Sequence, residues 1–174
     1  MPKLEDFIRD VPDFPNKGVI FKDITPLLAN AQALKQATAQ LAAPFAAAGV
    51  EIVVGIESRG FIFGSLVAQR LGAGFVPIRK PGKLPHKTVR AGYELEYGTD
   101  AIEMHADAIR RGQKVLMVDD LLATGGTMAA ACELVGKLGG DIVGVSFLIE
   151  LCFLNGRQKL AGYDVRSLIK VQGE

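Results

Sequence analysis

Apolar runs and amphipathic segments alternate along most of the chain. Runs of apolar, often β-branched residues predict buried strands, and apolar residues at every third or fourth position predict helices. Asn30 is the expected N-cap of a first helix that Pro44 ends. In chain order, the pattern predicts a helix over 31–43, a strand over 51–56, a helix over 61–71, a strand over 74–78, a helix over 100–111, a strand over 114–118, a helix over 127–138 and a strand over 142–149.

This alternation of strands and helices is typical of a parallel sheet built from β–α–β units. Because the predicted strands are continuously apolar, we expect helices to cover both faces of the sheet. The sequence therefore predicts one α/β domain over residues 1–174, with a doubly wound, mostly parallel sheet flanked by helices. Ligands of such sheets bind at the carboxyl ends of the strands, where we expect the functional residues.

Two segments depart from this pattern. Residues 1–30 are rich in proline after a short amphipathic piece, and residues 79–98 are polar and interrupted by Gly and Pro. Within the net charge of +1, residues 79–90 hold five basic side chains and no acidic one, whereas residues 91–107 hold five acidic side chains and no Lys or Arg. The balanced total argues against a general nucleic-acid or membrane-surface binder, but it is compatible with the binding of small anions.

The composition is that of a folded globular domain, with 49% hydrophobic and 22% charged residues. Cys132 and Cys152 form no CxxC motif, so we expect two reduced, mostly buried thiols. The start of the chain lacks the apolar core of a signal peptide, and the uncharged run over 36–50 is shorter than the roughly 20 residues of a membrane span. We therefore expect a cytoplasmic protein.

The most informative strand end follows the predicted strand 114–118. Asp119 and Asp120 come first, and after Leu-Leu-Ala a turn over 124–127, Thr-Gly-Gly-Thr, opens a helix. Backbone N–H groups, threonine hydroxyls and the helix N-terminus of such a turn bind a phosphate. The carboxylates suit a sugar diol, or a metal ion bound directly or through water.

Residues 118–127 resemble the phosphoribosyl-pyrophosphate (PRPP) motif of type I phosphoribosyltransferases, in particular of the members that act on adenine. The resemblance implies the fold of that family, with a small N-terminal hood over 1–30 and a flexible catalytic loop over 79–98. It implies that Asp119 and Asp120 address the ribose hydroxyls. The 5-phosphate would lie against Ala123, Thr124, Gly125, Gly126 and Thr127.

The segment over 57–61, Glu-Ser-Arg-Gly-Phe, resembles the pyrophosphate loop of the same family. The resemblance implies that Ser58 and Arg59 bind pyrophosphate, in a loop that often has a cis peptide bond without proline. A lysine matching Lys80 also binds pyrophosphate in similar enzymes. Lys83 is assigned to pyrophosphate as well, and the residue matching it reaches the neighbouring subunit. A homodimer is therefore implied as well.

The segment over 92–98 resembles the part of the family's mobile loop that closes over the reacting sugar. Residues matching Glu96 and Tyr97 are the ones implicated in catalysis there. The alternation of Tyr93, Leu95 and Tyr97 with acidic residues also fits an ordinary hairpin. The catalytic assignment therefore depends on the resemblance.

Residues 13–26 resemble the family's adenine-recognition hood. There an apolar residue matching Ile20 and a basic residue matching Lys22 meet the purine, with Phe21 between them. The family usually has Arg where this chain has Lys22, and an ammonium group lacks the planar fork of a guanidinium. Backbone hydrogen bonds to the purine edge do not depend on that difference.

The resemblance implies transfer of the 5-phosphoribosyl group of PRPP to N9 of adenine, which gives AMP and pyrophosphate in purine salvage. It implies Mg²⁺, held mainly by substrate oxygens and water, with Asp119 and Asp120 available as outer ligands. Arg59 and Lys80 would stabilise the leaving pyrophosphate, and Glu96 would move a purine-ring proton.

Two other classes stay open at this point. One is a type I transferase for another base, which the hood sequence and the Leu-Leu-Ala insert argue against. The other is a non-catalytic PRPP sensor that binds nucleic acid. Such a protein would need a basic extension or face, whereas residues 1–30 hold at least as many acidic as basic side chains. His86 and His105 are expected to be non-catalytic, His105 on the polar side of the helix over 100–111. Met104, Met117 and Met128 are expected in or near the core.

Overall fold

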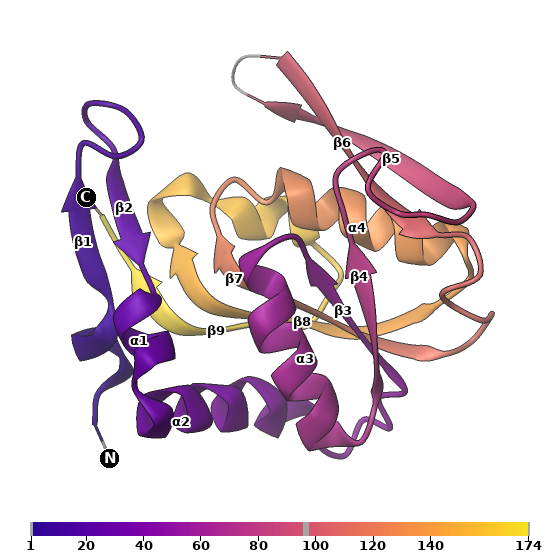
Figure 1. The fold of residues 1–174 in the computed structure, drawn as a ribbon, viewed down its shortest axis with the longest axis horizontal. Helices are drawn as coiled ribbons and strands as arrows, with labels where there is room; N and C mark the ends of the chain where they lie inside the picture. Colours follow the sequence, from indigo (N-terminus) through magenta and orange to yellow (C-terminus); the bar gives the residue numbers. More distant parts are fainter. Residues whose placement is uncertain (1, 96–97, 174) are drawn as a thin grey trace.

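The computed structural model describes residues 2–95 and 98–173, and a five-stranded sheet forms the centre of this part of the chain (Figure 1). The strands pair in parallel throughout. Their order across the sheet is β4 (Gly74–Ile78), β3 (Ile52–Ile56), β7 (Lys114–Leu122), β8 (Asp141–Leu151) and β9 (Val165–Val171). The predicted parallel sheet is confirmed.

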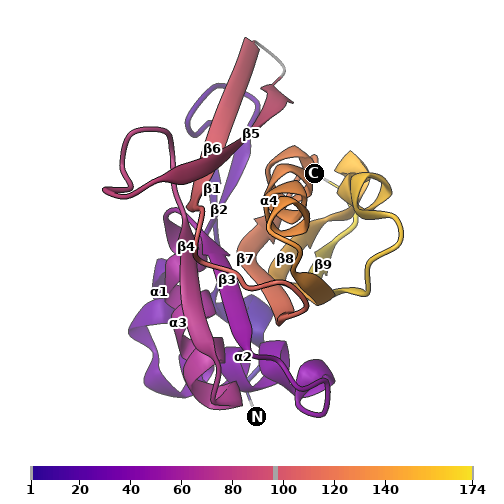
Figure 2. The same cartoon turned by 90° about the vertical axis from the view of Figure 1, so that its right-hand side faces the viewer.

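Helices cover both faces of the sheet because successive strand residues point to opposite sides. Val53 and Leu116 pack toward α2 (Ala31–Ala42) and α3 (Arg59–Leu71), together with the short α1 (Thr25–Ala29). Their neighbours Val54 and Met117 pack toward α4 (Gly126–Lys137). Figure 2 shows these helices on either side of the sheet.

Local signals place the helix ends where the sequence predicts them. The side chain of Asn30 accepts a hydrogen bond from the backbone N–H of Ala33 at 2.9 Å, which confirms the N-cap of α2. Pro44 lies in the 3₁₀ turn η2 (Ala43–Phe45) directly after that helix. Gly139, with a φ of 81°, follows the C-terminal end of α4.

The predicted helix over 100–111 is wrong. Residues Gly98–His105 form strand β6, which pairs antiparallel with β5 (Thr88–Leu95). Ile102 and Met104 are buried against the core beside α4, and the hydrogen bonds to β5 outweigh the helical spacing of the apolar residues. His105 consequently ends a strand and does not lie on a helix.

The sequence patterns also gave no sign of three other strands. The hood contains the hairpin of β1 (Arg9–Pro12) and β2 (Ile20–Asp23) after the 3₁₀ turn η1 (Leu4–Phe7). Strand β9 follows the 3₁₀ turns η3 (Cys152–Leu154) and η4 (Gly156–Leu160) and completes the sheet. Figure 1 shows the β1–β2 hairpin at the left and the β5–β6 hairpin at the top of the view.

The expected core residues and thiols are where the sequence predicts them. Met104, Met117 and Met128 are buried. Cys132 is a buried free thiol, whose pKa burial raises to about 12, and Cys152 is a half-buried one. Over the described residues, every helix is too short or too polar to cross a membrane.

Candidate active site

A cavity of about 330 Å³ opens where β3, β4 and β7 end and α3 and α4 begin. A cavity at the carboxyl ends of parallel strands is where this type of sheet binds ligands. It brings together residues that are distant in the sequence. The predicted site residues that line it are Ser58, Arg59, Lys80, Asp119, Asp120, Ala123, Thr124, Gly125, Gly126 and Thr127.

The two acidic residues lie within β7, because this strand is longer than predicted and runs on to Leu122. Asp120 is buried, and its backbone N–H donates to Asp119 Oδ1 at 2.9 Å. Burial and the adjacent charge of Asp120 raise the pKa of Asp119 well above its usual range. Two carboxylates this close in a poorly solvated site favour a ligand that supplies hydrogen-bond donors or a cation.

Arg59 connects the acidic pair to the hood. Its Nε atom lies 2.8 Å from Asp120 Oδ2, and its guanidinium lies over the ring of Phe21, 5.0 Å from the ring centre. The ion pair lacks hydrogen-bond alignment, so Asp120 Oδ2 has no hydrogen-bond partner among the described residues. A buried acceptor of this kind suits a sugar hydroxyl or a metal-bound water.

The turn over 124–127 leads directly into α4. Gly125 precedes the helix with a φ of 82°, a conformation that favours glycine, and no side chain of the described residues caps the helix. The first N–H groups of α4 therefore need acceptors from elsewhere, and a phosphate supplies them. The geometry fits the predicted phosphate-binding turn.

A network in the last part of the chain supports this turn from behind. The backbone of Gly156 packs directly against the turn: a side-chain carbon on Gly125 would lie 2.4 Å from the Gly156 carbonyl oxygen, and one on Gly156 would lie 2.3 Å from that of Ala123. Arg157 holds the segment by two hydrogen bonds to buried Glu150, at 2.6 and 2.7 Å. Ser167 of β9 also donates to Glu150. The turn is thus packed against a rigid, ion-paired element.

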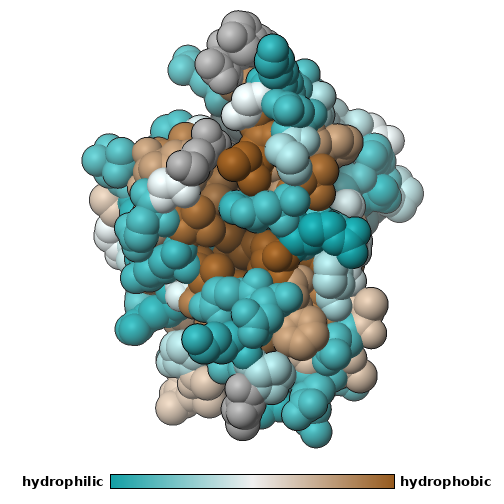
Figure 3. Space-filling view, turned by 90° about the vertical axis from the view of Figure 1, so that its left-hand side faces the viewer, coloured by the Kyte–Doolittle hydropathy of each residue, from teal (hydrophilic) through white to brown (hydrophobic). Residues whose placement is uncertain are grey.

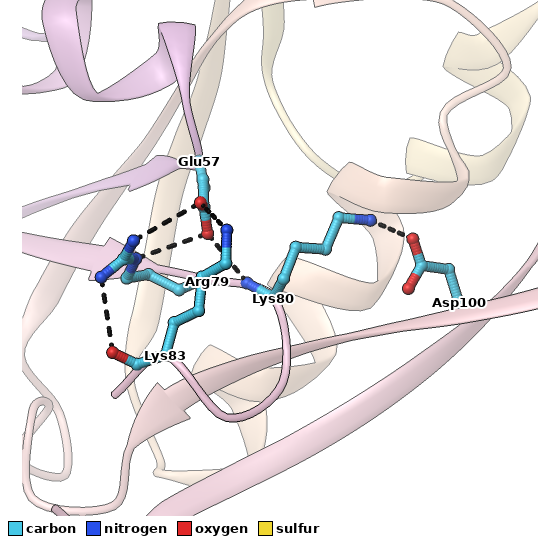
Figure 4. A network of polar contacts seen from close by, with 5 residues as sticks. All are labelled: Glu57, Arg79, Lys80, Lys83 and Asp100. Atoms are coloured by element: carbon cyan, nitrogen blue, oxygen red, sulfur yellow. Dashed lines mark hydrogen bonds and ion pairs between the residues drawn. The ribbon is translucent and has the colours of Figure 1, made fainter. Parts of the chain in front are cut away.

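The basic segment after β4 is held by two carboxylates, those of Glu57 and Asp100 (Figure 4). Lys80 Nζ donates to Asp100 Oδ2 and lies 3.0 Å from Tyr93 Oη. Burial opposes the charge of Lys80, but these hydrogen bonds outweigh it and raise the pKa of Lys80. Lys83 is not among the cavity-lining residues and binds Glu57 at 2.6 Å.

The peptide bond between Glu57 and Ser58 is cis, as the resemblance implied. Sequence reasoning assigned no role to Glu57, although this residue stands at the end of β3 directly before Ser58. It also missed Tyr93 and Asp100 as partners of Lys80. Their contacts join residues at least 13 positions apart and left no signal in the local pattern.

Among the hood residues, Phe21 approaches the cavity through its contact with Arg59. The neighbouring residues of β2 point elsewhere. Lys22 Nζ binds Asp10 Oδ1 at 2.7 Å, and Ile20 and Lys22 line a separate hollow of about 80 Å³. The adenine contacts assigned to Ile20, Phe21 and Lys22 stay predictions.

The candidate catalytic pair Glu96 and Tyr97 lies outside the described residues. The strands on either side, β5 and β6, form the hairpin that the alternating pattern allowed. His86 and His105 are not among the cavity-lining residues, and their rings lie 6.0 Å apart, edge to face.

A family model described as the phosphoribosyl transferase domain matches residues 22–169, and the chain belongs to this family. The adenine phosphoribosyltransferase of Christiangramia forsetii is 54% identical over 168 residues, covering 97% of this chain and 98% of that protein. Relatives named for adenine are thus similar over nearly the full length.

Solved structures agree with the sequence comparison. The adenine phosphoribosyltransferase of Thermoanaerobacter pseudethanolicus superposes with a TM-score of 0.94 at 53% identity, covering 97% of this chain and 98% of that one. The Saccharomyces cerevisiae enzyme, solved with adenine and an imino-altritol bisphosphate, has a TM-score of 0.89 at 40% identity over 94% of this chain and 95% of that one. The chain is therefore similar in fold to enzymes named for adenine.

Proposed function

We propose that this chain transfers the 5-phosphoribosyl group of PRPP to N9 of adenine, with AMP and pyrophosphate as products, as an enzyme of purine salvage. The observation that carries the proposal is the single cavity that joins a phosphate turn, two carboxylates and two basic segments. The similarity to adenine phosphoribosyltransferases over nearly the full length supports adenine as the base.

Each part of the cavity has a role in this reaction. The turn over 124–127 holds the 5-phosphate at the N-terminus of α4, and Asp119 and Asp120 accept hydrogen bonds from the ribose hydroxyls. Ser58, Arg59 and Lys80 hold the pyrophosphate, with Lys83 beside them. As the bond to pyrophosphate breaks, Arg59 and Lys80 stabilise the charge that develops on the leaving group.

Magnesium fits the donors that the structure offers. The acidic pair supplies carboxylate oxygens, which suit an ion that keeps much of its water. One of them, Asp120 Oδ2, accepts no hydrogen bond from the part of the chain that the structure describes. Over the described residues, His, Cys, Asp and Glu form no group of three or more that could hold a metal. When bound, Mg²⁺ supplies additional positive charge for the pyrophosphate oxygens.

The purine is assigned to the hood residues Ile20, Phe21 and Lys22, of which Phe21 contacts Arg59 at the cavity. We assign the movement of the purine proton to Glu96, with Tyr97 beside it, on a segment over 79–98 that closes and keeps water from PRPP. Tyr93 and Lys80 of this segment line the cavity, which supports its placement beside PRPP.

We also propose a cytoplasmic homodimer. The free thiols Cys132 and Cys152 are consistent with a reducing compartment. Figure 3 shows apolar residues gathered at the centre of the face that carries the hood, bordered by hydrophilic ones, which supports contact with a second copy. Light scattering coupled to gel filtration measures the mass of the particle and tests this assignment.

An AMP-formation assay with PRPP and Mg²⁺ tests the function. Adenine, hypoxanthine, guanine, xanthine and orotate are offered in turn, and the nucleotide product is identified by chromatography. We expect AMP from adenine and little product from the other bases. Absence of AMP would contradict the proposal, and preference for another base would change its substrate.

A further inference from the structure

Glu57, at the carboxyl end of β3, directs its side chain to the basic segment that follows β4 (Figure 4). Its Oε1 atom accepts a hydrogen bond from Lys83 Nζ at 2.6 Å and lies 3.5 Å from Arg79 Nη2. Its Oε2 atom accepts hydrogen bonds from the backbone N–H of Lys80 at 3.1 Å and from Arg79 Nε at 3.4 Å. Both carboxylate oxygens are thus occupied by one short stretch of chain.

The charges explain why the basic segment needs this partner. Arg79, Lys80 and Lys83 fall within five residues, and like charges this close repel one another. The side chain of Glu57 is only 15% exposed, so these cations, more than water, compensate its charge. Hydrogen bonds from Lys83, and then from Lys80 and Arg79, lower the pKa of Glu57 to about 2 although burial opposes this.

The same contacts determine the direction of the Lys80 side chain. Its backbone N–H points to Glu57, while its ammonium group reaches across to Asp100 (Figure 4). The same ammonium group contacts Tyr93, which lines the cavity. Glu57 is also joined covalently to Ser58, the first residue of the other basic segment. One carboxylate therefore connects the two segments to which pyrophosphate is assigned.

We propose that Glu57 is a positioning residue for the pyrophosphate group of PRPP. It acts through the segment over 79–83 and does not itself touch the substrate, because its oxygens are already occupied and its charge repels phosphate. This inference rests on the proposed function. It assigns to Glu57 the alignment of Lys80 with Ser58 and Arg59.

Glu57→Gln tests the inference, with Glu51→Gln as a matched control. The E57Q variant keeps the shape and one acceptor oxygen but loses the charge that holds Lys83 and Arg79. Glu51 precedes the same strand at its other end, and its Oε2 atom likewise accepts a backbone N–H, that of Lys114, at 3.0 Å. Glu57→Asp, which keeps the charge, serves as the conservative variant.

We expect E57Q to raise the KM for PRPP and the dissociation constant of pyrophosphate about tenfold, a cost of about 1.4 kcal/mol. The KM for adenine should change little, whereas kcat should fall because Lys80 also stabilises the leaving group. E57D should recover part of the loss, and E51Q should match the wild type. Thermal unfolding checks that all variants are folded.

An unchanged KM for PRPP in folded E57Q would overturn the inference. So would an equal loss in kcat and in both KM values, because this indicates a general structural role. Pyrophosphate binding measured by calorimetry tests the positioning role of Glu57 independently of the proposed transferase activity. If the wild type binds pyrophosphate but forms no AMP, the proposed function fails, and the comparison of E57Q with the wild type still decides the role of Glu57.

Discussion

Asp120 is a buried carboxylate whose charged neighbour Arg59 lies 2.8 Å away without a well-aligned hydrogen bond. We expect Asp120→Asn to raise the KM for PRPP about tenfold or more, since an amide is a weaker acceptor for ribose hydroxyls and leaves Arg59 without its counter-charge. Steady-state kinetics with varied PRPP measure this. Asp141→Asn, at the exposed start of β8, is the control and should leave KM unchanged.

The acidity of Glu57 predicts a pH-dependent contribution to stability. Its pKa is about 2 in the folded chain, against an ordinary value of 4.5, so folding favours the charged form. The contribution is fully present above pH 4.5 and is lost as the pH falls toward 2. Urea unfolding of the wild type and E57Q across this range should show a difference in unfolding free energy that shrinks on acidification. A constant difference would contradict the low pKa.

The residue types at the site could be predicted from sequence, but their connections could not. Asp119 and Thr124 stand in a local motif whose chemistry follows from the strand end and the turn. Glu57 stands beside an equally visible motif, yet its role depends on partners 22 to 26 positions away. Such contacts are set by which strands become neighbours in the sheet.

At the scale of elements, two helical glycines lead to opposite expectations. A side-chain carbon on Gly60, at the start of α3, would lie 2.7 Å from Asp119 Oδ1, whereas one on Gly136 in α4 would meet nothing within 4 Å. Alanine favours a helix over glycine by about 1 kcal/mol. We expect Gly136→Ala to raise the melting temperature with activity kept.

Gly60→Ala should instead raise the KM for PRPP, because the new methyl group displaces the Asp119 carboxylate. Calorimetry and PRPP-dependent kinetics on both variants make the comparison. Full activity in G60A would show that the close packing of α3 against β7 is not needed for the site.

Elements with a strong local signal were predicted well. Strand β4 has the predicted bounds, and α2 begins after its predicted cap, since apolar runs and caps act over a few residues. The helix predicted over 100–111 failed because β5, a separate strand, supplies its hydrogen bonds and places Ile102 and Met104 in the core. The β1–β2 hairpin was missed for a similar reason, as its pairing joins residues on either side of a proline-rich turn.

At the scale of the whole molecule, the hood residue Phe21 contacts Arg59 of the sheet domain beside the cavity. We expect Phe21→Leu to raise the KM for adenine several-fold, since a cation over an aromatic face contributes about 0.5–2 kcal/mol. The KM for PRPP should change less. Kinetics with each substrate varied separately test this. A larger rise in the KM for PRPP than in that for adenine would show that Phe21 supports pyrophosphate binding through Arg59 and would contradict its role at adenine.

The packing of the phosphate turn against Gly156 has a consequence for synthesis of the chain. The turn over 124–127 leaves the ribosome long before Gly156, Arg157 and Ser167, which fix the surface behind it. A nascent or prematurely ended chain therefore has the complete motif in its sequence but not the shaped turn. We expect competence to bind the sugar phosphate to arrive only once β9, which carries Ser167, has been synthesised.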